Sequence, residues 1–213
     1  MRALVVYCHP KEGSFNSAVR DTVMGRLEHA RVETRLRDLY AEGFQPVLTR
    51  DEWVGYEDTE TNRKPVADYC DDILWCDTLI FVYPTWWYGL PAMLKGWLDR
   101  VLLPDVAFHM PKAEGEIIKP GLHHIERLGV FTTCGASRWL TMFIGAPGKR
   151  TLMRGVGLLL KPRAKKAFAA HFLMDTAPRA SLEKHLKKVA AKTDTLIGMT
   201  ASRRAPLEGA PAE

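Results

Sequence analysis

The feature that most constrains the fold is a continuous apolar run at residues 78–83 (TLIFVY), which contains no charged residue and no alternation of polar and apolar positions. A strand with one solvated face alternates, whereas a strand buried on both faces is continuously apolar and belongs to a parallel sheet between two layers of helices. Residues 2–7 (RALVVY) repeat this pattern after their first residue. The two runs therefore predict the centre of a parallel sheet in an α/β protein.

Segments with apolar residues at helical spacing alternate with strand-like runs along the chain. The expected helices span residues 15–29, 65–75, 90–101 and 178–196, with helical pieces over 140–160 that residues 145–148 (GAPG) interrupt. The further expected strands span residues 32–39, 126–133 and 167–173, the first of them more exposed, as at a sheet edge. Strands that alternate with helices form parallel β-α-β units. Five such strands predict a doubly wound sheet of order 2-1-3-4-5 with helices on both faces.

The chain shows neither a repeat nor a linker that would divide it. We therefore expect one domain over residues 1–199, followed by a loose tail at 200–213 that is rich in Ala, Pro and Arg. Residues 40–64 have little periodicity and several turn-forming residues, and we call this segment the excursion. Irregular segments of this length are usually functional or mobile.

The composition of the chain excludes several classes of protein and several kinds of ligand. The four cysteines lie in or beside apolar runs without C-x-x-C spacing, which indicates neither a zinc site nor a disulfide framework and favours a reducing cytoplasm. No apolar stretch approaches the ~20 residues of a membrane span, and His123 and His124 are adjacent rather than at metal-ligand spacing, so we expect no metal. A net charge of +5 leaves anionic partners open, but the basic residues are scattered up to residue 149. The basic stretch at 149–166 is either a solvated surface or a contact for a phosphate-bearing small ligand, and we expect no nucleic acid.

In the expected topology the loops after strands one, three and four converge at the carboxyl edge of the sheet. The first loop, residues 9–16 (HPKEGSFN), precedes a helix whose free N–H groups attract phosphate. Helix capping by Ser14 or Asn16 explains the same residues equally well. The second loop holds Trp86, Trp87 and Tyr88 just after Tyr83, more aromatic surface than one following helix can cover. A planar heteroaromatic ligand that stacks on these rings is the favoured interpretation.

These residues resemble one family. Residues 83–101 (YPTWWYGLPAMLKGWLDRV), the HPKEGSFN loop and the TTCG segment at 132–135 are similar to motifs of the flavodoxin-like NAD(P)H:quinone oxidoreductases. This family includes quinone reductase, modulator of drug activity and the ancillary proteins of potassium efflux systems, and the resemblance extends from residue 1 to about residue 196.

The resemblance implies a flavodoxin-like fold that binds a flavin, with FAD favoured over FMN. It implies phosphate contacts from His9, Ser14, Phe15 and Asn16, ring contacts from Pro84, Thr85, Trp86, Trp87 and Tyr88, and contacts to the polar ring edge from Thr132, Thr133 and Gly135. The reactive centre is then flavin N5, so no catalytic side chain is assigned. The implied reaction is ping-pong hydride transfer from NAD(P)H to a quinone, in a homodimer with the excursion and the 90–101 helix at its interface.

Two departures limit the resemblance. Well-known mammalian members carry a Tyr and a His after this motif, whereas residues 136–145 (ASRWLTMFIG) contain neither, and Cys134 replaces a glycine. Proton relay by that pair is therefore not transferred to this chain. A flavin-bearing regulatory or ancillary subunit of a potassium-efflux-type system stays the alternative to an enzyme. The GAPGKRT segment at 145–151 is two residues too short for a nucleotide-triphosphate loop and is not interpreted as one.

Overall fold

The structure is a computed structural model that describes residues 1–199, so the tail expected at 200–213 lies outside the described residues. Five parallel strands form the central sheet: β1 (Arg2–Tyr7), β2 (Glu33–Asp38), β3 (Thr78–Thr85), β6 (Arg127–Cys134) and β7 (Lys165–His171). Their order is β2-β1-β3-β6-β7, which confirms the predicted order 2-1-3-4-5. β2 is the exposed edge strand, as its composition indicated.

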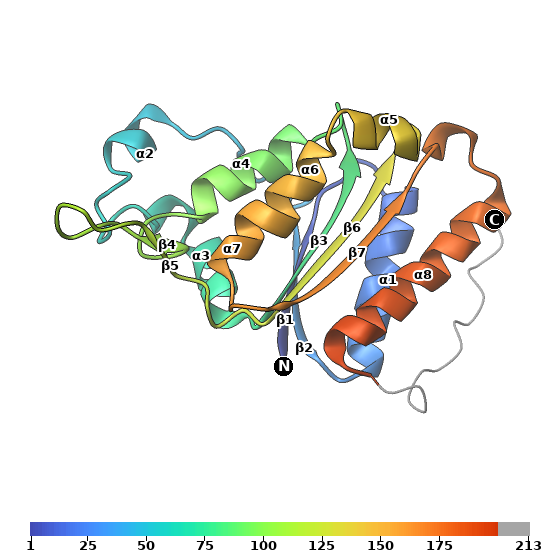
Figure 1. The fold of residues 1–213 in the computed structure, drawn as a ribbon, viewed down its shortest axis with the longest axis horizontal. Coiled ribbons are helices and arrows are strands. Elements are labelled where there is room, and N and C mark those ends of the chain that lie inside the picture. Colours follow the sequence, from blue (N-terminus) through green and yellow to red (C-terminus); the bar gives the residue numbers. More distant parts are fainter. Residues whose placement is uncertain (200–213) are drawn as a thin grey trace.

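Helices cover both faces of the sheet (Figure 1). On one face lie α1 (Phe15–His29) and α8 (Arg179–Ile197); on the other lie α3 (Ala67–Trp75), α4 (Ala92–Val101), α6 (Pro147–Arg150) and α7 (Gly157–Leu159). Alternate residues of β1 supply the two cores: Val5 packs in the cluster that contains residues of α1 and α8, whereas Val6 packs in the cluster that contains Trp97 of α4. The continuous apolar runs are thus buried on both faces, which is why they were recognisable in the sequence.

The connecting segments contain short elements that periodicity did not predict. They are α2 (Arg50–Val54), the two-stranded ribbon of β4 (Phe108–His109) and β5 (Lys119–Pro120), and the 3₁₀ turn η3 (Met174–Thr176). By contrast, α5 (Arg138–Phe143) and the π-helix η2 (Thr151–Val156) fall in or beside the region where helical pieces are expected, and the 3₁₀ turn η1 (Lys64–Val66) begins the helix expected at 65–75. The expected break in the fourth helical region is confirmed, because Gly145 and Ala146 have positive φ between α5 and α6. Pro65 lies in the 3₁₀ turn that leads into α3, whereas Pro91 is the N-cap of α4 and not a first-turn residue.

The excursion is attached to α4 by close packing and a buried ion pair. A Cβ atom at Gly96 would lie 2.1 Å from the carbonyl oxygen of Pro46, so only glycine permits this approach. The Arg100 guanidinium, which is buried, donates through Nε to Glu52 Oε1 at 2.9 Å and also to the carbonyl of Gln45. The irregular sequence of the excursion is therefore held in place by α4. Among residues 1–199, no helix is both long and apolar enough to cross a bilayer.

Candidate functional site

The first loop of the site joins β1 to the N-terminus of α1. Ser14 is the N-cap, and its Oγ accepts a hydrogen bond from the N–H of Ser17 at 3.2 Å, which confirms the capping interpretation. The N–H groups of Phe15 and Asn16 precede the first intrahelical hydrogen bond and have no acceptor inside the helix. Together with the helix dipole they form an anion-binding end. The capping and phosphate interpretations of this loop are therefore compatible.

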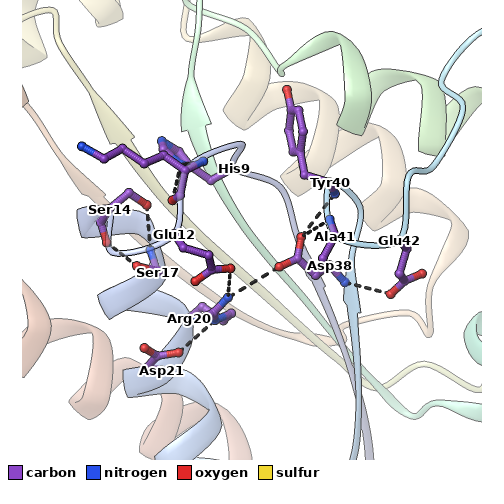
Figure 2. Close-up of polar contacts among 11 residues, drawn as sticks. His9, Glu12, Ser14, Ser17, Arg20, Asp21, Asp38, Tyr40, Ala41 and Glu42 are labelled. Atoms are coloured by element: carbon purple, nitrogen blue, oxygen red, sulfur yellow. Dashed lines mark hydrogen bonds and ion pairs between the residues drawn. The ribbon is translucent and has the colours of Figure 1, made fainter.

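Arg20 anchors this loop to the rest of the sheet edge (Figure 2). One turn into α1, its guanidinium pairs with Glu12 at 3.3 Å and with Asp38 at the end of β2 at 3.6 Å, and it lies 4.7 Å from the centroid of the Tyr7 ring. At the start of the loop, His9 Nδ1 accepts a hydrogen bond from the N–H of Lys11 at 3.1 Å. The loop is thus fixed at both ends, with the Glu12 carboxylate turned toward a cation.

A hydrogen bond between side chains joins the first loop to the loop after β6. Asn16 Nδ2 donates to Thr133 Oγ1 at 2.8 Å, and both residues are only 4% exposed. The other amide atom, Asn16 Oδ1, is buried and has no hydrogen-bond partner among the described residues. The loop after β3 is tied in by Thr85 Oγ1, which lies 2.8 Å from Thr132 Oγ1. The three loops therefore converge, as the topology predicted.

The aromatic loop forms a tight turn with an uncommon backbone. The N–H of Gly89 donates to the carbonyl of Trp86 at 2.9 Å, and the two central residues, Trp87 and Tyr88, have φ of 48° and 62°. Turns with two left-handed central residues normally carry Asn and Gly there, and a side chain in this region costs ~1–2 kcal/mol per residue. Strain of this kind is typical of functional sites. Tyr83, in contrast, is 1% exposed in the core and does not belong to the loop.

The loops enclose a cleft of about 600 Å³. Its predicted lining residues are His9, Ser14, Phe15, Asn16, Pro84, Thr85, Trp86, Trp87, Tyr88, Thr133 and Gly135, and the sequence missed Cys134, Ala136, Met174 and Asp175. Thr132 does not line this cleft. Successive residues of a strand point to opposite faces, so Thr133 meets Asn16 while Thr132 faces a neighbouring cavity.

The structure shows what the backbone requires at Cys134, which replaces a glycine of the family motif, and at its neighbour Gly135. Cys134 is the last residue of β6 and is not among the residues with positive φ, so its backbone does not require glycine. At Gly135 a Cβ would lie 2.7 Å from Asp175 Oδ2, so a larger residue there requires only that the Asp175 side chain moves. Asp175 follows the fifth strand, β7, whose loop is not among the three loops that the topology predicts to converge, so its place in the site was not predicted.

The buried cysteine and histidine side chains near the site have structural rather than catalytic roles. Burial raises the pKa of the Cys8 thiol to about 12, so it is not a ready nucleophile, as expected for a thiol at a buried strand end. His171 is buried, its Nε2 lies 3.0 Å from Ser181 Oγ, and burial lowers its pKa. Its ring packs edge-on against Phe15 and against His185. All four cysteines are free and buried, and residues 1–199 contain no group of three or more potential metal ligands.

Comparison with known proteins identifies the family. The model of the Flavodoxin_2 family, described as a flavodoxin-like fold, matches residues 1–151. The chain belongs to this family. The Flavodoxin_2 chain is 34% identical over 108 residues to an uncharacterized NAD(P)H oxidoreductase of Escherichia coli, YcaK, covering 50% of this chain and 55% of that one. It is 33% identical over 123 residues to NAD(P)H dehydrogenase [quinone] 1 of Rattus norvegicus, covering 50% and 45%. It thus spans about half the length of these curated relatives.

Solved structures share the fold over nearly the whole described chain. Smu.1420 from Streptococcus mutans has a TM-score of 0.75 at 28% identity, covering 92% of this Flavodoxin_2 chain and 100% of that one. An NAD(P)H:quinone oxidoreductase from Methanothermobacter marburgensis has a TM-score of 0.77 at 23% identity, covering 92% and 97%. An FMN-dependent NADH-azoreductase from Bacillus anthracis, solved with FMN, has a TM-score of 0.71 at 13% identity, covering 92% and 98%. The last two likenesses concern the fold alone.

Proposed function

We propose that this chain is a flavin-dependent NAD(P)H oxidoreductase that passes a hydride from NAD(P)H to a quinone or a similar acceptor. One observation carries the proposal: a helix N-terminus and a strained aromatic turn line the same cleft, where the Asn16–Thr133 bond ties the first loop to the loop after β6 and Thr85 meets Thr132. A ligand that spans this cleft needs an anionic end and a flat aromatic end, and a flavin nucleotide has both. The names of the relatives from E. coli and rat support the same class of reaction.

The residues present fit a flavin. The anion-binding end has two backbone N–H groups without intrahelical acceptors, at Phe15 and Asn16. The buried Asn16 Oδ1, which lacks a partner among residues 1–199, can accept a hydrogen bond from a ligand hydroxyl or N–H. At the other end Trp86 is 42% exposed and Trp87 94% exposed, so their rings are free to cover a flat ligand.

Each part of the chain would then have a defined task. His9, Ser14 and the N–H groups at the start of α1 would bind the phosphates, while Arg20 keeps the Glu12 carboxylate from repelling them. The aromatic turn, with Pro84 and Thr85, would orient the ring system, and Thr133 and Gly135 would meet its polar edge. A bound flavin would supply hydride chemistry at N5, and the proposed order is ping-pong, with NAD(P)H as donor and the quinone as acceptor. We assign no acid–base side chain, because α5 contains neither Tyr nor His.

The form of the flavin is an open part of the proposal. The HPKEGSFN loop favours FAD by its resemblance, whereas a structural neighbour from B. anthracis is an FMN complex, so the comparisons give FAD no support. Mass spectrometry of the flavin released from purified protein will decide between the two. We also propose that residues 1–199 form one cytoplasmic flavin-binding domain, which the four free, buried cysteines support.

A homodimer is part of the same proposal. The excursion exposes Val47, Trp53 and Val54 at 73%, 66% and 79%, and on α5 the rings of Trp139 and Phe143 stack at 5.5 Å while both are exposed. Exposed apolar groups of this size mark interaction surfaces. On α4, by contrast, exposed Lys95 and Asp99 pair with each other, so the excursion and α5 are the better supported surfaces.

The proposed function is tested with the purified protein, flavin and a quinone. We expect flavin absorbance, and steady oxidation of NADH or NADPH that depends on the quinone. A protein that binds neither FAD nor FMN would refute the proposal. A protein that binds flavin but consumes no NAD(P)H with any quinone would favour a regulatory or ancillary subunit instead.

A further inference from the structure

A second cavity of about 340 Å³ adjoins the cleft. Residues at the carboxyl ends of β6 and β7 line it together with residues of α5 and α6, and it shares Thr85, Tyr88 and Cys134 with the cleft. Its volume is at the low end of the ~300–1,000 Å³ of small-molecule pockets. A ligand in this cavity would therefore be a neighbour of any ring held by the aromatic turn.

Cations surround the cavity and carboxylates are missing from it. Arg138 of α5, Lys149 of α6 and Lys188 of α8 all line it, whereas no Asp or Glu does. Among residues 1–199 none of the three forms an ion pair with a carboxylate within 4.0 Å. Lys149 Nζ lies 4.7 Å from the centroid of the Phe168 ring, which holds the ammonium against the cavity wall. Three separate elements thus direct unpaired positive charge to one small volume.

The interior of the cavity is apolar and aromatic. Tyr83, Thr132 and Cys134 form its buried floor, and the rings of Phe168 and Phe172 are half-buried in its walls. The three cations are exposed side chains and therefore lie at its mouth. A ligand with a flat apolar ring can place that ring in such a cavity and leave an anionic group at the rim. There the anionic group loses little hydration and is attracted to the three cationic side chains.

We propose that this cavity binds the electron acceptor, and that the acceptor is an aromatic compound with a carboxylate or sulfonate group. The inference rests on the proposed function, because it identifies the ligand as the partner of a flavin in the adjoining cleft. The phosphates of NAD(P)H are a poorer match. A dinucleotide exceeds this volume, and its hydrated pyrophosphate would leave the aromatic walls uncovered.

Equilibrium binding tests the cavity without reference to catalysis. Calorimetry of the flavin-loaded protein compares naphthoate with acetonaphthone, a neutral ketone of similar shape. We expect naphthoate to bind about tenfold more tightly, and K188Q and K149Q each to weaken naphthoate about two- to fivefold while leaving acetonaphthone unchanged. K187Q is the matched control. It removes the same charge from the neighbouring exposed residue of α8, which does not line the cavity, and should change neither ligand.

Kinetics then assigns the ligand its role. With saturating NAD(P)H, K188Q should lower kcat/KM for a sulfonated naphthoquinone but not for the unsulfonated parent. Equal binding of naphthoate and acetonaphthone to an active reductase would overturn the cavity proposal alone. The cavity proposal would also be overturned if K188Q raised the KM for NADPH but left the ratio of kcat/KM for the sulfonated and unsulfonated quinones unchanged. That result would assign the cavity to the dinucleotide. Charge-selective binding by a protein with no reductase activity would refute the proposed function, and with it the role of the ligand as acceptor.

Discussion

The left-handed backbone of Trp87 predicts that one substitution can raise stability and lower function together. Trp87 has φ of 48° and is 94% exposed, so its side chain contributes almost no burial to the fold. Replacement by Asn, which tolerates this region far better, should remove most of a strain of ~1–2 kcal/mol. For a chain of this size ~1 kcal/mol shifts Tm by about 2–4 °C. We therefore expect Trp87→Asn to melt a few degrees above the wild type.

The matched variant is Trp87→Ala, which removes the same ring but lacks the short polar side chain that allows Asn to adopt the left-handed region. Both variants should lose a stacking interaction of ~0.5–1.5 kcal/mol, and flavin affinity should fall by about two- to twelvefold. The rate of flavin reduction by NAD(P)H should fall in both, because the ring no longer orients the ligand.

Thermal unfolding after removal of flavin separates the backbone effect from ligand binding, and stopped-flow flavin bleaching measures the reductive rate. Equal Tm values for the Asn and Ala variants would show that residue 87 stores no strain. Wild-type flavin affinity and reductive rates in both variants would show that the ring has no part in the site.

Three further changes are expected to act through single contacts. Asn16→Leu removes the donor to Thr133 and should weaken flavin binding about ten- to a hundredfold in a fluorescence-quenching titration; unchanged affinity would leave the loop as a helix cap only. Burial lowers the pKa of His185 from 6.5 to about 4. As the pH falls from 6.5 to 4 the unfolded chain therefore binds a proton at this residue before the folded chain does, and the free energy of unfolding decreases by up to about 3 kcal/mol. His185→Leu should flatten the plot of Tm against pH between 6.5 and 4, and an unaltered plot would contradict this assignment. Trp53→Glu should turn the proposed dimer into monomers in sedimentation velocity, and a monomeric wild type at micromolar concentration would refute the dimer itself.

The central strands could be predicted from the sequence because burial on both faces leaves a continuous apolar run. The run at 78–83 became β3, and the pattern at 2–7 became β1. The convergence of three loops also followed, since it depends only on the order of parallel strands.

Other features depend on neighbours that a linear pattern does not contain. The turn at Trp87 has aromatic residues where its geometry favours Asn and Gly, so turn propensity gave no warning of it. The place of Asp175 depends on the close approach of two loops at Gly135. Thr132 was assigned to the cleft with Thr133, although the alternation of side chains along a strand would have separated them.

The bond between Asn16 and Thr133 connects residues that are 117 positions apart in the chain. During synthesis, the N-terminus of α1 is made long before the strand that completes its ligand site. The cleft can exist only once β6 has paired with β3, so a folding intermediate that consists of β1, β2 and β3 has no complete site. A ligand that bridges the two loops therefore stabilises the finished sheet and not its precursors. Its presence during expression should raise the yield of the complete fold without protecting an N-terminal fragment from proteolysis.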